Sequence, residues 1–351
     1  MLRRLIAVAA VVLAACGDST EPSPEPDPVL FQSPLLGTTG AELFFGAYID
    51  HRPSQPRDYQ CGPKAYSGHQ GVDILLRNFK VQDSGVTVVA AAAGQVVSAA
   101  NGFPDRNTVN GSGGFGNHVV IDHGRATSTI YGHLKRESVT VGIGETVLAG
   151  QRLGQVGSSG NSNWPHLHFE LRISGFTVDP FAGPCNPGAT SLWQTQPAYH
   201  DGFAVLQAGV SDRQEVSYAD LLEVLPPVDT LRSDLTTLYY WLELFNIQAE
   251  SVRVELKAPD GSVNQSFAGG RATTFSATFL VFRFPLIGLV TMEGLWRLEL
   301  SQKPLEGGGP MALAHTQSFY LKPAPIAAAP RFQAGARVPT LERWADARDD
   351  R

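Results

Sequence analysis

Two histidines lie on one face of a predicted strand near the middle of the chain. From His166 to Arg172 polar and apolar residues alternate strictly, which indicates a strand with one buried face. Side chains two residues apart point to the same side of a strand, so His166 and His168 should lie side by side while the apolar residues between and after them face the core. Two adjacent imidazoles contribute little to packing. They suit a metal ligand beside a proton acceptor.

A histidine and an aspartate form a second motif, His69-Gln-Gly-Val-Asp73. On an extended strand the two side chains would lie about 13 Å apart, too far to share one ion, and a helix is disfavoured by Gly68 and Gly71. We therefore expect a glycine-bent loop that brings His69 back beside Asp73, where the strand Asp73–Leu76 begins. This spacing is weak evidence alone, but together with the histidine pair it predicts a metal site.

Two histidines and one aspartate would make a suitable zinc site. Zinc binds imidazole nitrogen and carboxylate oxygen at about 2.0–2.2 Å, and catalytic sites typically have three protein ligands plus water. The net positive charge of such a group would lower the pKa of the water toward neutrality. The spare histidine of the pair would be a general base, and His133, in the sequence Y-G-H-L, is suited to donate a proton or stabilise an oxyanion.

Other polar residues near these motifs have structural interpretations. His118 alternates along a predicted strand and His123 lies in a predicted turn, so both are expected to be structural. Glu170 continues the face of the histidine pair, where it would orient a ligand imidazole. His133 alone would also be structural more often than catalytic, so the prediction of catalysis depends on the motifs in combination.

Short strands bounded by Gly, Asn, Asp or Pro must position these residues. Between residues 30 and 188 the expected strands are Val86–Ala90, Gln95–Ala99, Asn117–Asp122, Ser128–His133 and His166–Arg172. The Gly/Asn-rich segment from Gly102 to Gly116 is long enough to rim a binding groove. No segment of useful length has helical periodicity in this part of the chain, so an all-β domain is expected.

Together these motifs resemble those of the lysostaphin-like zinc endopeptidases, which cut the peptide cross-links of bacterial cell walls. The resemblance covers roughly residues 65–182 and includes H-x-G-x-D at 69–73, G-N-H-V-V-I-D-H-G at 116–124, Y-G-H-L at 131–134, a glycine-punctuated run at 141–157 and P-H-L-H-F-E at 165–170. It implies the duplicated hybrid motif fold, an antiparallel β-sheet peptidase domain with lipoyl-carrier-like strands over residues 32–190. The implied substrates are the cross-link peptides of peptidoglycan.

The same resemblance gives a role to each motif residue. It implies that one Zn²⁺ ion has three ligands: His69, Asp73 and His168. It also implies that His166 deprotonates the attacking water and that His133 holds this water or stabilises the oxyanion.

Two further positions bear on the groove. Some relatives place a tyrosine there from just before the first ligand, and either Tyr66 or Tyr59 fits this role by spacing. Asn163-Trp-Pro165 stands where relatives commonly have Thr-Gly-Pro. We therefore expect Trp164 on the groove wall, where it would alter the usual substrate preference.

The N-terminal residues indicate export. Two arginines precede an apolar run shorter than the roughly 20 residues that cross a bilayer, so residues 1–15 are predicted to be a signal peptide. The sequence L-A-A-C ending at Cys16 resembles the bacterial lipobox, which predicts a lipid on Cys16; an ordinary cleaved signal is the alternative. The Pro-rich residues 16–31 would then tether the protein to a membrane of the cell envelope, facing the periplasm or the exterior.

Three cysteines are an odd number for an exported protein. If Cys16 carries lipid, Cys61 and Cys185 remain as a pair that brackets most of the histidines. An oxidising compartment would let them form a disulfide. Two buried free thiols are the alternative.

A second all-β domain is expected over residues 200–322. Its predicted strands have the spacing of an immunoglobulin-like β-sandwich: Leu238–Phe245, Ser251–Leu256, Ala277–Phe284, Leu295–Leu300 and His315–Leu321. A short helix is expected at Ala219–Val224. Five aromatic residues suit either a sugar-stacking platform or the core, and strand spacing favours the core: Tyr239, Tyr240, Trp241, Phe245 and Trp296. Residues 323–351 are expected to be a flexible tail.

Charge and motifs together limit the possible functions. The formal net charge is −6 and no basic patch is present, so nucleic acid is not an expected partner. The leading hypothesis is a membrane-anchored zinc metalloendopeptidase that hydrolyses peptidoglycan cross-links. The alternatives are a non-catalytic adaptor that activates cell-wall amidases and an endopeptidase that acts on a Gly-rich protein.

Overall fold

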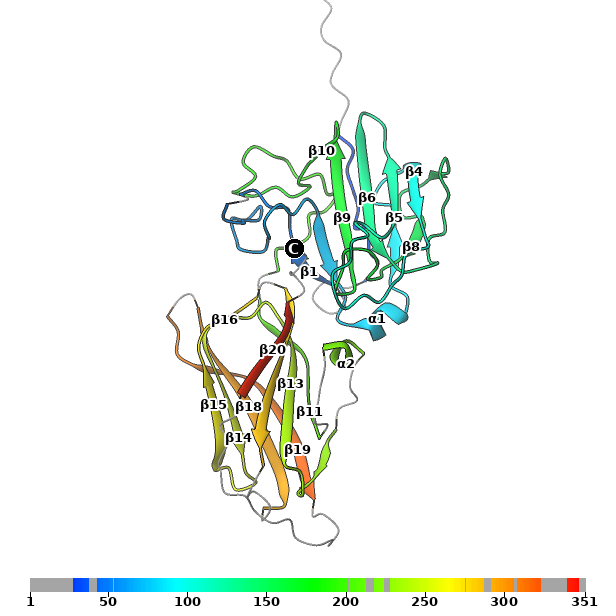
Figure 1. Cartoon of the computed structure of the whole chain (residues 1–351). Helices are drawn as coiled ribbons and strands as arrows, with labels where there is room; N and C mark the ends of the chain where they lie inside the picture. The colour runs from blue at the N-terminus through cyan, green and yellow to red at the C-terminus, as the bar shows by residue number, and fades with distance from the viewer. Residues whose placement is uncertain are drawn as a thin grey trace, which may run out of the picture.

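The computed structural model describes residues 28–37, 43–52, 54–200, 202–212, 218–223, 228–274, 276–286, 292–305, 308–322 and 340–346. The predicted signal peptide, Cys16 and most of the predicted tether lie outside these ranges. In the described part of the chain, no helix is both long enough and apolar enough to cross a membrane. Figure 1 shows two β-rich domains, one above the other, with the short helices α1 (Phe79–Asp83) and α2 (Tyr218–Leu222) between them.

The first domain is built on one antiparallel sheet. Its strands follow the order β1 (Phe44–Ala47), β2 (Val72–Leu75), β9 (His166–Ile173), β6 (Thr127–Leu134), β5 (Asn117–Asp122), β4 (Gly94–Ala100) and β7 (Thr146–Val147), and β10 (Phe176–Thr177) pairs with β9. A separate two-stranded sheet consists of β3 (Thr87–Val89) and β8 (Arg152–Gln155). The predicted antiparallel all-β fold is confirmed, and the predicted strands are present with ends shifted by no more than one residue.

Strand β9 has the two-faced character that its alternation predicts. Leu167, Phe169 and Leu171 are at most 1% exposed and pack in the core of the first domain. The intervening polar side chains lie on the opposite face and are buried as well. A buried polar face requires partners for its nitrogen and oxygen atoms.

The predicted disulfide between Cys61 and Cys185 is present. It joins residues separated by 124 positions in the chain, and closing a loop of that length restricts the unfolded chain by about 4–5 kcal/mol in the entropic model. The backbone supports the same connection, because the amide of Cys185 donates to the carbonyl of Tyr59 at 2.9 Å.

The second domain consists of two packed sheets with an apolar core between them. One sheet has the order β11 (Ala204–Ser211), β13 (Thr237–Phe245), β17 (Ala277–Pro285) and β20 (Thr340–Asp346). The other has the order β12 (Thr230–Arg232), β19 (Ala312–Lys322), β18 (Gly294–Pro304), β14 (Gln248–Lys257) and β15 (Val263–Gly269), with β16 (Ala272–Thr273) on β14. Tyr240 and Trp296 belong to the core between the sheets, as expected.

Strand β20 lies inside the predicted flexible tail. It pairs antiparallel with β17, so the prediction of a flexible tail is wrong for residues 340–346. The sequence T-L-E-R-W-A-D does not alternate strictly between apolar and polar residues, and strand patterns therefore do not reveal it. The strand forms because the open edge of β17 offers backbone donors and acceptors that need partners.

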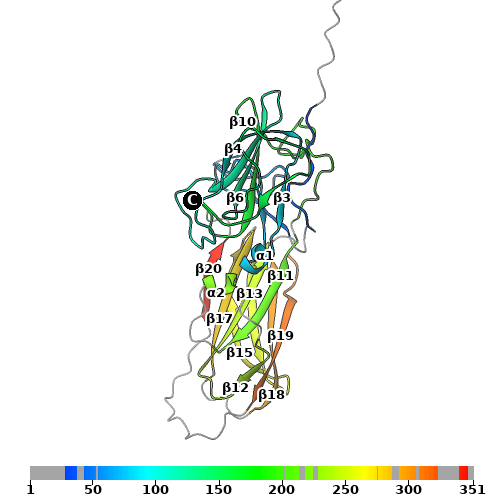
Figure 2. The same ribbon diagram turned by 90° about the vertical axis from the view of Figure 1, so that its right-hand side faces the viewer.

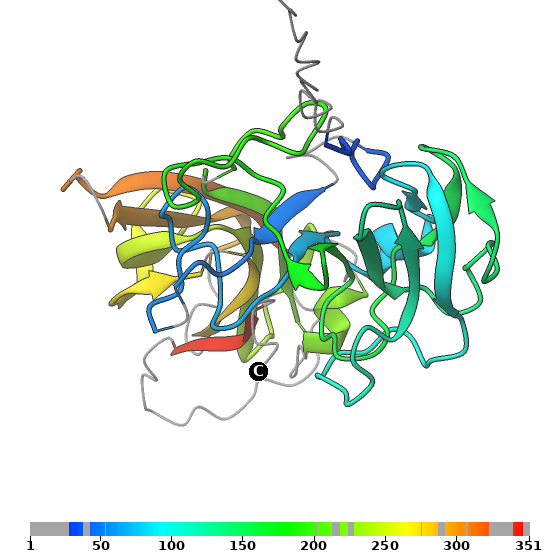
Figure 3. The same ribbon diagram turned by 90° about the horizontal axis from the view of Figure 1, so that it is seen from above.

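A third apolar cluster packs the two domains against each other, and we call it the junction. Its first-domain members are Phe44, Leu75, Phe79 and Trp164, and its second-domain members are Leu221, Leu222, Tyr239, Trp241, Phe245, Ala277, Phe279 and Val281. Three of the aromatic residues predicted for the core lie here instead, because they alternate along β13 with the residues that face the sandwich core. Figure 2 shows α1 at the lower edge of the first domain, directly above the sandwich. Seen from above (Figure 3), the cyan and teal strands of the first domain extend beyond the sandwich on one side.

Candidate metal centre

Three potential metal ligands meet where β2 pairs with β9. Asp73 and His168 are register partners on these strands, and His168 Nδ1 lies 2.9 Å from Asp73 Oδ1. His69 Nε2 lies 3.1 Å from Asp73 Oδ2 and 3.4 Å from His168 Nδ1. All three residues are buried. The structure therefore brings together the three residues that the sequence analysis names as zinc ligands.

A bent loop brings His69 to this position, as expected from its glycines. Gly68 has a φ of +76°, a conformation that glycine adopts readily. A Cβ atom at Gly71 would lie only 2.4 Å from His168 Cε1, so a side chain at this position would displace the imidazole. His69 Nδ1 donates to the buried carbonyl of Tyr48 at 2.8 Å, which leaves His69 Nε2 facing Asp73.

The spacing and the charge of the three residues fit a zinc ion. Ligand atoms about 2.1 Å from a tetrahedral ion lie about 3.4 Å apart, close to the separations in this cluster. Burial acts to raise the pKa of Asp73, but His69 and hydrogen bonds from His168 hold it well below its usual range. Burial likewise acts to lower the pKa of His168, yet Asp73 and Glu170 raise it to about 9. The centre thus stabilises positive charge, which a cation requires. Among the described residues, this trio is the group with metal-ligand spacing.

Two further histidines, His166 and His133, lie beside the trio. His166 Nδ1 donates to the carbonyl of Trp164 at 2.7 Å. Its buried Nε2 lies 3.8 Å from Asp73 Oδ1 and has no hydrogen-bond partner among the described residues. His133 Nδ1 donates to the carbonyl of Ser159 at 2.8 Å, and its ring centroid lies 4.6 Å from that of His166.

The surroundings of both imidazoles favour the neutral form. Burial lowers the pKa of His166, although Asp73 opposes the effect. Burial also lowers the pKa of His133 well below its usual range, and the neighbouring His166 and His168 add to the shift. A neutral imidazole whose Nδ1 carries the proton has a free lone pair on Nε2, so both rings can accept a proton or a hydrogen bond.

The backbone of His133 has an unusual conformation. Its φ is +58°, in the left-handed region that costs a non-glycine residue free energy. Its amide donates to the carbonyl of Phe115 at 2.7 Å, which helps to hold this conformation. Such backbone geometry is common at functional sites, because it aims a side chain that regular strand geometry would turn away.

The structure distinguishes between the two candidate tyrosines. Tyr66 stacks on His69 with ring centroids 4.2 Å apart, and its hydroxyl donates to Asp73 Oδ2 at 3.2 Å. Tyr59 is fully buried in the core, against Tyr48 and Phe181. Tyr66 therefore lies at the centre and Tyr59 does not.

Glu170 lies beyond His168, on the side away from Asp73. Its Oε2 is 3.6 Å from His168 Nε2, and its Oε1 accepts hydrogen bonds from Arg172 and Thr177. This arrangement suits the predicted role of orienting the His168 imidazole through its second nitrogen.

His118 and His123 have partners elsewhere. His118 contacts the carbonyl of Gly116 and the Ser98 hydroxyl. His123 contacts the carbonyl of Ala93 and the Thr129 hydroxyl. Both are half-buried residues with partners outside the candidate metal centre, which agrees with a structural role.

The expectation that Trp164 lies on the groove wall is wrong. Its side chain is fully buried and stacks on Phe279 of the second domain, with ring centroids 5.2 Å apart. The sequence pattern of the first domain alone contains no information about this partner, which is 115 residues further along the chain.

A cavity of about 760 Å³ borders His69. Its lining includes Gln70, Thr190 and a hydrogen-bonded pair, His51 and Asp179, whose Nε2 and Oδ2 atoms are 2.7 Å apart. Sequence reasoning missed this pair because its members are 128 positions apart, and no spacing rule connects them.

Residues 67–180 match the sequence profile of Peptidase family M23. The chain is 40% identical over 131 residues to the DD-carboxypeptidase/endopeptidase Mpg of Neisseria meningitidis serogroup B, covering 37% of this chain and 26% of that protein. It is 35% identical over 113 residues to the outer membrane antigenic lipoprotein B of Haemophilus influenzae, covering 32% and 24%. It is 42% identical over 67 residues to the murein hydrolase activator EnvC of Escherichia coli, covering 19% and 16%.

The chain spans about a quarter or less of the length of these relatives. The similarity therefore concerns one domain, and it includes the segment that carries the trio and both neighbouring histidines. Residues 67–180 therefore match Peptidase family M23, which agrees with the resemblance of the sequence motifs to the lysostaphin-like endopeptidases.

Proposed function

We propose that this protein is a zinc metalloendopeptidase of the bacterial cell envelope that hydrolyses the peptide cross-links of peptidoglycan. One observation carries the proposal: three buried ligand-type residues face two buried, neutral imidazoles within a single site. A structural metal site has no use for two adjacent neutral proton acceptors. A hydrolytic site needs them.

The ligands would be His69 through Nε2, Asp73 through its carboxylate and His168 through Nδ1. A zinc ion bound there would lower the pKa of a water molecule toward neutrality and polarise the scissile carbonyl. The Glu170 carboxylate, 3.6 Å from His168 Nε2, would attract the proton on that nitrogen and favour the ring orientation with Nδ1 toward the ion.

His166 is the general base in this proposal. Its Nδ1 proton is held by the Trp164 carbonyl, so Nε2 is the atom that accepts a proton from water and returns it to the leaving amine. His133 has the same tautomer because of Ser159, so its Nε2 accepts a hydrogen bond and holds the water. The Tyr66 hydroxyl is then the available donor to the developing oxyanion.

The cavity beside His69 suits an extended peptide. It has a volume of about 760 Å³ and mixes backbone, carboxylate, imidazole and amide groups with a few apolar residues. Such a lining can pair with peptide N–H and C=O groups, as a polar cross-link substrate requires. One similar protein is named a DD-carboxypeptidase/endopeptidase, which agrees with this substrate class.

We also propose that the protein is anchored through a lipid on Cys16. The sequence before Cys16 supports this, and so does the similarity to a protein named an outer membrane lipoprotein. An anchor would keep the site close to the cell wall.

A non-catalytic adaptor is the second candidate, because another similar protein is named a murein hydrolase activator. An adaptor has no need of the trio or the two neutral histidines, and all five are present in this chain. Their presence favours the enzyme.

The test is mass spectrometry of the muropeptides that the protein releases from purified sacculi. The two-domain chain from Pro28 onward, loaded with zinc, is compared with its His168→Ala variant and with His118→Ala, a histidine outside the site. We expect new cleavage products from the unchanged chain and from His118→Ala, and none from His168→Ala. One bound zinc per chain without products would argue against peptidoglycan as substrate, and no zinc at all would favour the adaptor.

A further inference from the structure

Trp164 connects the proposed base to the second domain. It is fully buried in the junction, where its ring stacks on Phe279 of β17 with an interplanar angle of 27°. It also lies two residues before His166 in the chain. A side chain with no exposed surface cannot contact substrate directly, so any effect of Trp164 on catalysis must act through its neighbours.

The backbone of Trp164 determines the tautomer of His166. Its carbonyl accepts a hydrogen bond from His166 Nδ1 at 2.7 Å and another from the Ser162 hydroxyl at 2.8 Å. A carbonyl can only accept, so His166 must carry its proton on Nδ1 and present the lone pair of Nε2 to the centre. If this carbonyl were displaced, neither the orientation of the His166 ring nor its tautomer would be fixed.

Two hydrogen bonds hold the Trp164 segment against the end of β2. The indole Nε1 donates to the Leu76 carbonyl at 2.7 Å, and the Leu76 amide donates to the Pro165 carbonyl at 2.9 Å. Leu75, the register partner of His166, is itself part of the junction. The strand that carries Asp73 and the strand that carries His166 and His168 therefore both reach the second domain at the same point.

Polar contacts across the junction reinforce the apolar packing. The guanidinium of Arg77 donates to the carbonyl of Leu206 on β11. Lys64 lies over the ring of Phe245, with its Nζ 4.6 Å from the centroid. A cation over an aromatic face and a guanidinium on a backbone carbonyl both restrict sliding of the two surfaces.

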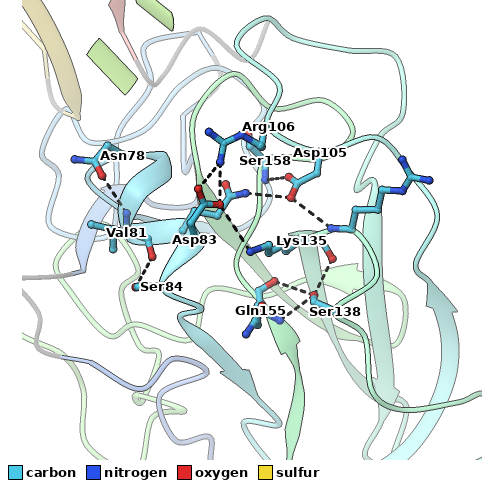
Figure 4. A network of polar contacts seen from close by, with 12 residues as sticks. Asn78, Val81, Asp83, Ser84, Asp105, Arg106, Lys135, Ser138, Gln155 and Ser158 are labelled. Atoms are coloured by element: carbon cyan, nitrogen blue, oxygen red, sulfur yellow. Dashed lines mark hydrogen bonds and ion pairs between the residues drawn. The ribbon is translucent and has the colours of Figure 1, made fainter. Parts of the chain in front are cut away.

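A second route runs through the loop around Arg106 (Figure 4). Arg106 pairs with Asp83 at 2.8 Å. It also pairs with Glu223 of the second domain. The neighbouring Asp105 accepts a hydrogen bond from the Ser158 amide at 2.7 Å. The Ser158 hydroxyl in turn lies 3.1 Å from that of Ser162, which binds the Trp164 carbonyl. The last contact of this route is therefore with the Trp164 carbonyl.

We propose that Trp164 is a positioning residue for His166 and that the second domain, by packing Phe279 against it, is part of the catalytic apparatus. The inference rests on the proposed function only in that it takes His166 as the base. The second domain is then a fixed support and does not swing independently on a linker. Misplacing a catalytic group by about 1 Å costs on the order of 10²-fold in rate, so loosening this support should lower kcat with little change in KM.

Two substitutions in the same strand separate this role from simple stability. Phe279→Leu removes the ring that contacts Trp164, whereas Phe282→Leu removes a ring of equal size that faces the sandwich core. Both rings are fully buried, so both substitutions should lower the stability of the second domain by similar amounts. Only Phe279→Leu should alter the orientation and the tautomer of His166.

The readout is the ¹⁵N spectrum of the histidine side chains in the zinc-loaded two-domain chain, together with kcat, KM and zinc content. We expect His166 to be a pure Nδ1–H tautomer in the unchanged chain and in Phe282→Leu. In Phe279→Leu we expect a mixture of tautomers and a kcat about 10-fold lower, with one zinc still bound. An unchanged tautomer and kcat in Phe279→Leu would overturn the proposal, and so would equal effects of both substitutions.

If Phe279→Leu does not fold, Trp164→Phe is a milder variant that keeps a ring in the junction and removes the hydrogen bond to Leu76. It should also mix the His166 tautomers, and a pure Nδ1–H signal would count against the proposal. The spectra need no substrate. If the unchanged chain cleaves nothing, the proposed function fails while the coupling of the second domain to His166 is still tested.

Discussion

Two buried carboxylates in this chain respond to burial in opposite ways. Asp73 in the candidate metal centre is 3% exposed and Glu243 in the second domain is 1% exposed. Burial acts to raise the pKa of each. At Asp73 the histidines overcome the effect and hold the pKa well below its usual range. At Glu243 only Arg77 opposes it, and the pKa rises to about 8.

The difference follows from the partners that each carboxylate has. Asp73 contacts two imidazoles within 3.1 Å, whereas Glu243 Oε1 has no hydrogen-bond partner among the described residues. Glu243 lies on the face of β13 that Tyr239 and Trp241 share, toward the first domain. The candidate metal centre therefore stabilises charged groups, while the junction consists mainly of apolar contacts and contains one acid in its protonated form.

The largest effect is expected from removing the charge of the metal centre. Asp73→Asn keeps the size of the side chain but no longer balances a cation, so zinc should be lost and cleavage should fall by on the order of 10³-fold, equivalent to about 4 kcal/mol. Metal analysis and muropeptide release are the measurements. Retention of stoichiometric zinc by Asp73→Asn would contradict the assignment of Asp73 as a ligand.

Glu243→Gln should change the pH dependence of stability without affecting zinc. The folded-state pKa of Glu243 is raised to about 8 from its ordinary 4.5, so the folded state favours the protonated acid. The contribution of protonated Glu243 to the free energy of unfolding is fully present below about pH 4.5 and is lost as pH rises through about 8. As pH rises through this window, the free energy of unfolding of the glutamine variant should increase relative to that of the unchanged chain, by at most about 1.4 kcal/mol per pKa unit.

Denaturant unfolding at pH 5, 7 and 9 measures this gap, which is the difference in free energy of unfolding between Glu243→Gln and the unchanged chain. A gap that is constant across the three pH values would mean that Glu243 is not protonated in the folded state.

Gly71→Ala should weaken zinc binding by roughly 10-fold or more, because its Cβ would lie 2.4 Å from His168 Cε1 and displace the ligand. Gly68→Ala is the matched control. Gly68 has a φ of +76° but no atom within 4 Å of a Cβ, so this variant should cost about 1 kcal/mol of backbone strain and weaken zinc binding less than Gly71→Ala does. Equal zinc affinities in the two variants would show that His168 accommodates the extra carbon.

The smallest effect is expected at Tyr66. Tyr66→Phe keeps the ring that stacks on His69 and removes the hydroxyl near Asp73. We expect kcat to fall by about 10-fold, or about 1.4 kcal/mol, with zinc content unchanged. Steady-state kinetics on a cross-linked peptide measure this. An unchanged kcat would remove Tyr66 from the oxyanion role.

The strands of the first domain were predictable because they are local patterns. The alternation from His166 to Arg172 sets both the strand and the face on which the histidines lie. The disulfide was also predictable, from the pairing of the two cysteines left after Cys16. Neither inference needs a partner from another part of the chain. The roles of the site residues remain predictions.

Features that depend on distant partners were not predictable. Tyr66 and Tyr59 are equally plausible by spacing, and only the packing of Tyr59 into the core separates them. The pair of His51 and Asp179 forms because two loops meet beside the cavity. Strand β20 exists because β17 has an open edge.

The sequence by itself determined the types of the candidate ligands, the strand that carries His166 and His168, and the loop that bends His69 toward Asp73. These are short-range properties, set by side-chain alternation and by glycine backbone freedom. Only the tertiary structure decided that Trp164 faces the second domain and that Glu243 is buried beside the junction. Burial is a property of the surface that covers a residue, and here that surface comes from a different domain.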